Sequence, residues 1–415
     1  MSAIEEKVRE SKRVSYILAA ASTSQKNDAL LKIAVDLKTN EKKILSANKV
    51  DTDKLKEKKD YSKAFYDRLL LTPERIDAMA EGLKDIAALP DPVGEITDMT
   101  KRPNGIMVGS MRTPLGVVGI IYEARPNVTV DAAALALKSG NAVVLRGSSE
   151  AINSNMALVS VIRESLKAVG LPEDGVVLIE NTDREAAKEL MSMNNYLDVL
   201  IPRGGKPLIK AVVENATVPV IQTGAGNCHT YIDEYAQIDM ALSIAVNAKV
   251  QRPGVCNAME TLLVHRNIAA AYLPKLIPML INENVEIRGC EETRKHHPLV
   301  KEATVEDWDT EYLDLILAVK VVDSMEDAIQ HIHLYGTGHS EAIISSDYLK
   351  TKEFYQKVDA AAVYVNASTR FTDGFVFGLG AEMGISTQKL HARGPMGLKA
   401  LTASKYIILG EGQIR

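Results

Sequence analysis

Cys256 is the residue of this sequence best suited to covalent chemistry. It lies in the segment 251–258, which reads Gln-Arg-Pro-Gly-Val-Cys-Asn-Ala. Proline and glycine predict a loop there, and an apolar segment, 261–264, follows. A thiol on a loop beside the Arg252 guanidinium could act as a thiolate nucleophile. The alternative is a buried structural cysteine, which is common and which the local sequence alone favours.

Asn127 is a second candidate. It lies between an expected strand, 117–121, and an expected helix, 128–138. An amide in that position could donate a hydrogen bond to an oxyanion. Asparagine also suits a helix N-cap, and this is the simpler interpretation of the residue taken alone.

Three glycine-containing turns follow expected strands. They are 146–149 (Arg-Gly-Ser-Ser), 203–206 (Arg-Gly-Gly-Lys) and 224–226 (Gly-Ala-Gly). Backbone amides, hydroxyls and guanidinium groups suit a phosphate. Each turn alone could be an ordinary connection, and the G-x-G-x-x-G fingerprint does not occur at the first turn. Together they predict a nucleotide crevice at the carboxyl ends of parallel strands. The residues expected to bind the nucleotide there are Arg146, Ser148, Ser149, Gly204, Gly205 and Gly224.

Alternating strands and helices must position these residues. From Gly116 onward we expect strands at 117–121, 142–145, 176–179, 199–201 and 218–221, with helices at 128–138 and 152–169. Such repeated units predict a parallel, doubly wound sheet. A second α/β region begins near residue 245, with expected strands at 261–264, 315–322, 341–344 and 361–365.

Other elements have simpler signals. An apolar stripe at positions 30, 33, 34 and 37 predicts a helix before the sheet. Thr182 and Glu185 could form a capping box. Asn104-Gly105 predicts a hairpin whose second strand is 106–112, and 401–409 is typical of a terminal strand.

Composition limits the class of protein. A chain of 415 residues predicts two to three domains, and its net charge of −5 with no basic block excludes nucleic acid as an expected partner. Apolar runs fall far short of the ~20 residues of a membrane span. A charged N-terminus and three cysteines predict reduced thiols and a cytoplasmic location. His331, His333 and His339 have few carboxylates or thiols nearby, so we predict no metal.

Taken together, these segments resemble the aldehyde-dehydrogenase superfamily along nearly the whole chain from about Gly116. Within it the match is to the branch that reduces an acyl phosphate of glutamate. The segments that carry the resemblance are 122–130, 201–205, 226–229, 251–258, 322–343, 366–374 and 380–387.

The resemblance implies that Cys256 is the nucleophile and that Asn127 and the Cys256 backbone N–H form the oxyanion hole. Hydrolytic members carry a glutamate base where this chain has Gln222. The implied activity is therefore NADPH-dependent reduction of L-glutamyl 5-phosphate to L-glutamate 5-semialdehyde and phosphate, through a cysteine thioester, in proline biosynthesis. A hydrolytic aldehyde dehydrogenase and a non-catalytic scaffold are the alternatives.

The resemblance also implies ligand contacts. NAD-preferring members place an acid where this chain has Ser149, beside Arg146, so the cofactor is expected to be NADPH. Glu311 resembles the glutamate that holds the nicotinamide ribose. Charge and motif position make Arg125, Arg203 and Arg370 candidates for the substrate anions, and Glu123 or Asp373 candidates for its ammonium group.

The implied fold has two doubly wound parallel-sheet domains and a small β oligomerisation element. The NADPH-binding domain is expected at 1–96 and 116–246, and the catalytic domain at 247–385. The hairpin, 97–115, and the terminal segment, 386–415, are expected to join neighbouring subunits in a homodimer or tetramer. A transient contact with glutamate 5-kinase, which makes the unstable substrate, is a further expected partner.

Overall fold

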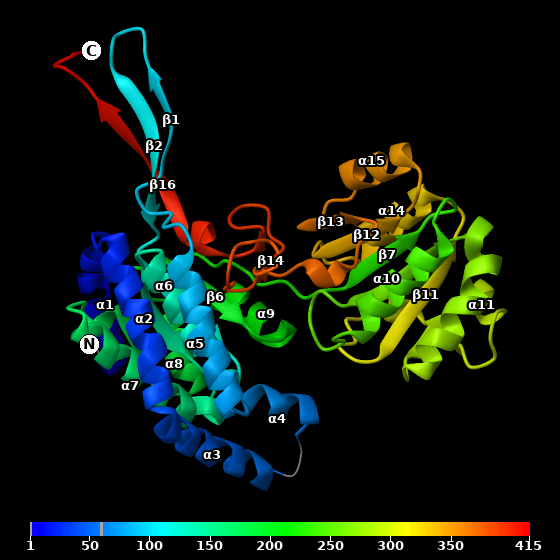
Figure 1. Cartoon of the computed structure of the whole chain (residues 1–415), viewed down its shortest axis with the longest axis horizontal. Coiled ribbons are helices and arrows are strands. Elements are labelled where there is room, and N and C mark those ends of the chain that lie inside the picture. Colours follow the sequence, from blue (N-terminus) through cyan, green and yellow to red (C-terminus); the bar gives the residue numbers. More distant parts are fainter. Residues whose placement is uncertain (1, 59–60) are drawn as a thin grey trace. The chain divides into compact units, whose positions relative to one another are not determined.

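The computed structural model describes residues 2–58 and 61–415. It divides into two compact units (Figure 1). Unit 1 is the chain up to Thr223 together with Gly378–Gly384 and Pro395–Arg415, and unit 2 is Gly224–Phe377 with Ile385–Gly394. The boundary therefore precedes the expected one at 246/247. The reason is an unpredicted strand, β7 (Cys228–Ile232), which pairs with strands of unit 2.

A four-stranded parallel sheet forms the centre of unit 1, in the order β5-β4-β3-β6. Its strands are β3 (Val117–Tyr122), β4 (Ala142–Arg146), β5 (Val176–Leu178) and β6 (Val199–Arg203). These confirm four of the predicted strands. The fifth, 218–221, is reduced to a single parallel bridge between Leu200 of β6 and Val220. In this bridge Leu200 N–H donates to the Pro219 carbonyl at 2.8 Å, and Ile221 N–H donates to the Leu200 carbonyl at 3.0 Å.

Helices cover both faces of this sheet. The connections β3–β4 and β4–β5 run through α6 (Pro126–Lys138) and α7 (Ile152–Ala168), whereas α8 (Arg184–Met191) returns the chain from β5 to β6. Right-handed crossovers place α6 and α7 on one face and α8 on the other. The N-cap of α8 is Asp183, and its side chain makes no capping bond, so the predicted Thr182 box is wrong. The remaining helices are α1 (Ala3–Ala19), α2 (Thr23–Thr39), α3 (Glu41–Glu57), α4 (Lys63–Leu69), α5 (Pro73–Ala88) and α9 (Lys206–Asn215).

Three antiparallel strands project from the helices of unit 1 (Figure 1). They are β1 (Ile96–Lys101), β2 (Met107–Pro114) and β16 (Thr402–Leu409), in the order β1-β2-β16. Gly105 lies in the hairpin turn with φ 89°, a conformation that favours glycine. The predicted hairpin and terminal strand are confirmed.

Unit 2 contains a seven-stranded, entirely parallel sheet in the order β10-β9-β11-β8-β7-β12-β13. Its remaining strands are β8 (Met259–His265), β9 (Glu286–Gly289), β10 (Lys301–Glu302), β11 (Ile316–Val322), β12 (Ser340–Ile344) and β13 (Ala362–Val365). One apolar cluster lies under α10 (Ile238–Val250) and α11 (Arg266–Asn282). Another lies under α14 (Met325–Tyr335) and α15 (Tyr348–Lys357). The short elements are α12 (Glu291–Arg294), α13 (Val305–Trp308), β14 (Ile385–Ser386) and β15 (Gly394–Pro395).

Candidate active site

The carboxyl edge of the unit 1 sheet carries the turns after β3, β4 and β6, as the sequence predicts. Gly205 N–H donates to Glu123 Oε1 at 2.8 Å, which joins the turns after β6 and β3. A Cβ on Gly204 would lie 2.6 Å from Glu123 Cδ. The glycines therefore let two turns interlock closely at one edge of the sheet.

Arg146 lies at the end of β4, and its Nη2 donates to the carbonyl oxygens of Thr182 and Asp183. Burial lowers the pKa of its guanidinium. Within the described part of the chain, its buried Nε has no hydrogen-bond partner. A buried donor without an acceptor at a strand end suits an anionic group of a dinucleotide.

Ser149 is exposed at the same turn. Its hydroxyl donates to Glu150 Oε2 at 3.2 Å, and Glu150 in turn pairs with Lys58 at 3.1 Å. Glu150 is thus adjacent to Ser149, but Lys58 compensates the negative charge of Glu150.

Asn127 lies exposed in the first turn of α6. The N-cap of that helix is Arg125, so the alternative interpretation of Asn127 as the N-cap is wrong. The Asn127 amide donates to Asp131 Oδ2 at 3.2 Å. Burial raises the pKa of Asp131 to about 6, against the lowering effects of Asn127 and the nearby Arg203. A polar group of Asn127, Asp131 and Arg203 therefore stands at the carboxyl edge of unit 1.

The loop that carries Cys256, the predicted nucleophile, lies at the amino-terminal edge of the unit 2 sheet. Cys256 precedes β8, and the segments before β7 and β12 stand beside it because all these strands are parallel. This amino edge is not where the general rule for open α/β sheets places ligands. The nucleotide crevice predicted at carboxyl ends of strands therefore agrees with the turns of unit 1. Cys256 lies at the other edge of its own sheet.

The main chain at Cys256 is held from two sides. The Cys228 thiol donates to the Cys256 carbonyl oxygen at 3.1 Å. A Cβ on Gly226 would lie 1.5 Å from the same oxygen, so only glycine fits there. Gly226 N–H donates to Glu311 Oε1 at 2.6 Å, which places the predicted Glu311 beside the nucleophile loop.

The structure separates the cysteines by environment. None of the three cysteines, all in the described part of the chain, forms a disulfide; Cys228 is fully buried and Cys256 is partly exposed. Burial and, to a lesser extent, Glu341 raise the pKa of Cys228, which favours its protonated, donating form. Its Sγ lies 3.7 Å from His339 Nδ1, which contacts Ser340 Oγ at 2.8 Å. Cys228 thus belongs to a buried polar network behind the loop.

A fully buried ion pair supports the segment that carries Glu311. Lys249 Nζ and Glu260 Oε2 are 2.5 Å apart. Glu260 Oε1 also accepts a hydrogen bond from Leu313 N–H at 3.1 Å, and Leu313 has φ 54°. Burial raises the pKa of Glu260 and lowers that of Lys249. The pair therefore anchors a strained turn two residues from Glu311.

Arg370 stands on a turn, η3 (Thr369–Phe371), that is tied to the nucleophile loop. Its Nε donates to Gln251 Oε1 at 2.9 Å. The Asn257 amide donates to the Thr372 carbonyl at 2.8 Å, and the Thr369 hydroxyl donates to the Asn257 carbonyl at 2.7 Å. Both ends of the loop thus hold the turn that carries Arg370.

Gly224 lies in a different unit from the other predicted cofactor glycines. It belongs to unit 2, and its N–H donates to the Ile385 carbonyl at 2.8 Å. The turn 224–226 follows the segment that bridges to β6, but it belongs to unit 2, and a role of Gly224 in cofactor binding stays a prediction.

The three histidines considered for a metal have different surroundings. His331 is buried among the rings of His229, Trp308 and Tyr335. His339 lies beside Cys228, and His333 is exposed. Across residues 2–58 and 61–415, no group of three or more His, Cys, Asp or Glu is arranged to hold a metal. The same residues include no helix long and apolar enough to cross a membrane.

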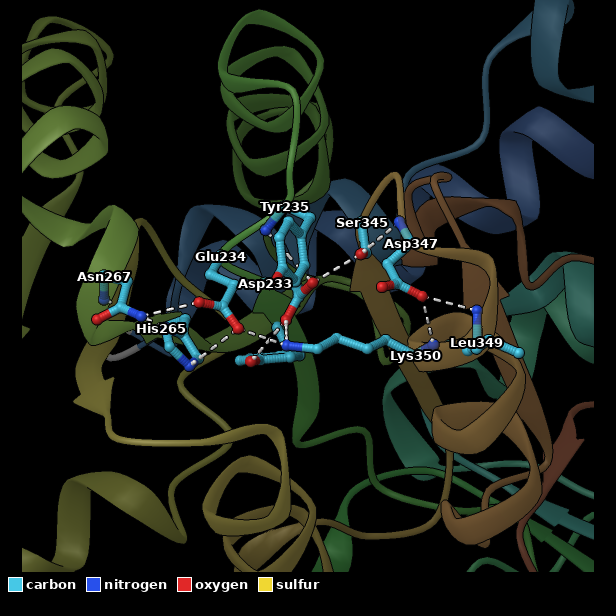
Figure 2. Close-up of polar contacts among 10 residues, drawn as sticks. Asp233, Glu234, Tyr235, His265, Asn267, Ser345, Asp347, Leu349 and Lys350 are labelled. Atoms are coloured by element: carbon cyan, nitrogen blue, oxygen red, sulfur yellow. Dashed lines mark hydrogen bonds and ion pairs between the residues drawn. The ribbon is translucent and has the colours of Figure 1, made fainter.

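An ion network closes the carboxyl ends of β7 and β12 in the unit 2 sheet (Figure 2). Asp233 follows β7, is fully buried, and accepts hydrogen bonds from the Ser345 and Tyr231 hydroxyls. Lys350 Nζ lies 3.4 Å from Asp233 and 2.6 Å from Glu234. Polar side chains that satisfy one another thus occupy the strand ends where a ligand would ordinarily bind.

Two parallel sheets, a glycine-rich carboxyl edge in unit 1 and a held cysteine loop in unit 2 define the aldehyde dehydrogenase class. A model of the aldehyde dehydrogenase family matches residues 2–310. An acetylating aldehyde dehydrogenase from Geobacillus thermoglucosidasius, 18% identical, shares the fold with a TM-score of 0.72 over 99% of this chain and 97% of that one.

Nearer relatives define the branch. The γ-glutamyl phosphate reductase of Moorella thermoacetica is 61% identical over 412 residues, which cover 99% of this chain and 98% of that protein. The crystal structure of the Thermotoga maritima γ-glutamyl phosphate reductase is 51% identical, with a TM-score of 0.96 over 99% of each chain. The chain belongs to the aldehyde dehydrogenase family and, within it, to the γ-glutamyl phosphate reductases.

Sequence reasoning missed three residues of the site: Gln251, Asn257 and Cys228. Each lies within a segment that the family resemblance marked. Their types gave no separate signal, because an amide or a thiol acquires its role only from the carbonyl or guanidinium that it meets in the fold.

Proposed function

We propose that this enzyme reduces L-glutamyl 5-phosphate to L-glutamate 5-semialdehyde and phosphate with NADPH, in proline biosynthesis. Membership of the γ-glutamyl phosphate reductases supports the reaction class. The observation that carries the proposal is the partly exposed Cys256, whose carbonyl is fixed by Cys228 and Gly226. A nucleophile held at one position lowers the entropic cost of attack.

The reaction follows from these residues. The Cys256 thiolate attacks the acyl carbon, the C–O bond to phosphate breaks, and a thioester forms on the sulfur. The Asn127 amide and the Cys256 backbone N–H stabilise the oxyanion that develops on the carbonyl oxygen. The nicotinamide, when bound, supplies the hydride, after which the carbon–sulfur bond breaks and the aldehyde leaves. Gln222 cannot act as a base toward water, so the thioester is kept for reduction.

The family uses a nicotinamide cofactor, and we infer that NADPH is the preferred form. Support comes from Arg146, whose buried Nε has no partner in the described chain. Ser148 and Ser149 lie on the same turn, and Lys58 offsets the charge of Glu150. Gly204 and Gly205 allow close approach at the neighbouring turn. Glu311, beside Gly226, is our candidate for the nicotinamide ribose.

Three arginines are our candidates for the anionic groups of the substrate. Arg125 and Arg203 lie at the carboxyl edge of unit 1, and Arg370 lies beside the nucleophile loop of unit 2. Each presents a guanidinium, whose planar fork suits carboxylate and phosphate oxygens.

We also infer a cytoplasmic homo-oligomer, a dimer or a tetramer. The projecting strand β16 supports this assembly, because its edge carries the exposed apolar residues Tyr406, Ile408 and Leu409. Three free thiols support a reducing compartment. A transient contact with glutamate 5-kinase remains our expectation, because the acyl phosphate is unstable.

The test uses the reverse reaction with glutamate 5-semialdehyde, phosphate and NADP⁺, following NADPH formation in wild type and Cys256→Ala. We expect phosphate-dependent activity that the variant loses. Activity that does not need phosphate would identify a hydrolytic dehydrogenase instead. Activity that survives in Cys256→Ala would remove the thioester route.

A further inference from the structure

Arg252 and Arg370 lie near Cys256, and neither forms an ion pair with a carboxylate of the described chain. Arg252 is exposed, and in the described chain it makes no hydrogen bond or ion pair. Arg370 is partly buried and binds Gln251 only through Nε; its two terminal nitrogens have no acceptor among the described residues. Burial lowers the pKa of Arg370, the Arg252 guanidinium lowers it further, and Cys256 and Asp373 oppose both effects. Arg370 is therefore within electrostatic reach of both Arg252 and Cys256, and Arg252 lies on the same loop as Cys256.

Holding like charges together costs free energy unless an anion completes the group. Gln251 orients Arg370, because its Oε1 accepts a hydrogen bond from Arg370 Nε at 2.9 Å. The amide is neutral, so it does not cancel the charge of the guanidinium. A glutamate in the same place would form an ion pair. The neutral amide orients the Arg370 guanidinium and leaves its positive charge available to an anion.

The position of the loop explains why side chains must supply this charge. The loop follows the C-terminal end of α10, where Gln251 is the C-cap. The C-terminus of a helix carries partial negative charge, which disfavours both a thiolate and a phosphate. At a carboxyl edge, by contrast, helix N-termini would attract the anion. An anion site at this amino edge therefore needs guanidinium groups.

We propose that Arg252 and Arg370 form the subsite for the phosphoryl group of the acyl phosphate, and that Gln251 is the residue that orients Arg370. This inference rests on the proposed function. The phosphoryl group is bonded through oxygen to the carbon that Cys256 attacks, so it must lie next to the thiol. Its two negative charges match two guanidinium groups, whereas the α-carboxylate carries one charge and lies four carbons away from that carbonyl.

The first experiment measures the KM values for inorganic phosphate and for glutamate 5-semialdehyde in the reverse reaction. The variants are Gln251→Glu, Arg252→Gln and Arg370→Lys, with Gln356→Glu on the exposed face of α15 as the control for charge. Hydrogen bonds to charged groups contribute about 1.5–3 kcal/mol, so we expect the phosphate KM to rise about 10-fold or more. The semialdehyde KM and the control should stay at wild-type values.

A second measurement needs no turnover. Inorganic phosphate should slow the alkylation of Cys256 by iodoacetamide in the wild type and in Gln356→Glu, and much less in Gln251→Glu. Arg252→Gln changes an exposed side chain that makes no hydrogen bond or ion pair within the described residues, so we expect this variant to fold like the wild type.

The outcomes separate the two proposals. If Cys256→Ala is inactive and the phosphate KM is unchanged in all three variants, the subsite is wrong and the proposed function stands. If only the semialdehyde KM rises, the arginines bind the α-carboxylate and the phosphate assignment is wrong. If Cys256→Ala retains activity, the proposed function itself fails, whatever the phosphate KM.

Discussion

At the residue scale, the fate of a cysteine depends on what surrounds it. Cys256 is partly exposed, whereas Cys228 is buried and donates to the Cys256 carbonyl. Three cysteines in a sequence are equivalent until the fold distinguishes them. The family motif could mark Cys256 in advance, but the hydrogen bond from Cys228 joins segments 28 positions apart and has no local signature.

The Cys228 contact leads to the first prediction. Cys228→Ala removes the donor to the Cys256 carbonyl, and a weak hydrogen bond contributes about 0.5–1.5 kcal/mol. We expect kcat to fall about 3- to 10-fold, with the substrate KM unchanged. Cys228→Ser should restore the rate because it keeps a donor. Cys290→Ala is the matched control, and equal losses in both alanine variants would contradict a positioning role.

A second prediction concerns Asp131 and pH. Its folded pKa of about 6 lies above the value of about 3.9 in an unfolded chain. The native state therefore holds this proton more tightly. Wild-type stability contains a contribution that is present at low pH and is lost as pH rises from about 4 to about 6. Relative to wild type, Asp131→Asn should gain in Tm between pH 4.5 and pH 8. The same Tm difference at both pH values would disprove the assignment.

At the element scale, helices and strands with regular apolar periodicity were predictable from the sequence, whereas a buried strand with polar residues was not. The stripe of α2 and the apolar strands β3 and β4 follow from periodicity and are confirmed. Strand β7 begins with Cys-His-Thr, which does not resemble a buried strand, although every residue of it is buried. Its position in the middle of a sheet overrides its composition. The grouping of the three glycine turns met the same limit, because the sequence does not show that the chain passes into unit 2 at Gly224.

The third prediction concerns Gly226, which packs directly against the loop that carries Cys256. Its substitution by alanine would bring a Cβ to 1.5 Å from the Cys256 carbonyl oxygen, so the nucleophile loop must move. A displacement of about 1 Å can cost about 100-fold in rate, and we expect kcat to fall by that order. The measurement is steady-state kinetics beside a thermal melt.

Gly82→Ala in α5 is the matched control for that substitution. No atom lies within 4 Å of its Cβ, and alanine in a helix interior is favoured over glycine by about 0.5–1 kcal/mol. This variant should keep full activity and melt slightly higher. If Gly226→Ala retained wild-type kcat, the close approach would not constrain the loop.

At the scale of the whole molecule, β16 is an edge strand with exposed apolar side chains. Tyr406 is 78% exposed and Ile408 is 58% exposed. An edge of this kind in a monomer would pair with other chains, so a second copy is its expected cover. We predict that Ile408→Lys lowers the oligomeric mass measured by light scattering. Leu349→Lys on α15, where the side chain is 72% exposed, should leave the mass unchanged. A wild-type monomer, or equal effects of both changes, would contradict the assembly.

The closed carboxyl edge of unit 2 has a consequence for how the protein can be modified. The ion network of Asp233, Glu234 and Lys350 caps the strand ends remote from the thiol loop (Figure 2). The turn after Glu234 leads from β7 into α10 and carries the exposed Tyr235. A peptide tag or a fused domain inserted there would have the whole length of the strands between itself and Cys256. That side of unit 2 is therefore the natural place to immobilise the enzyme or to link it to a consecutive one.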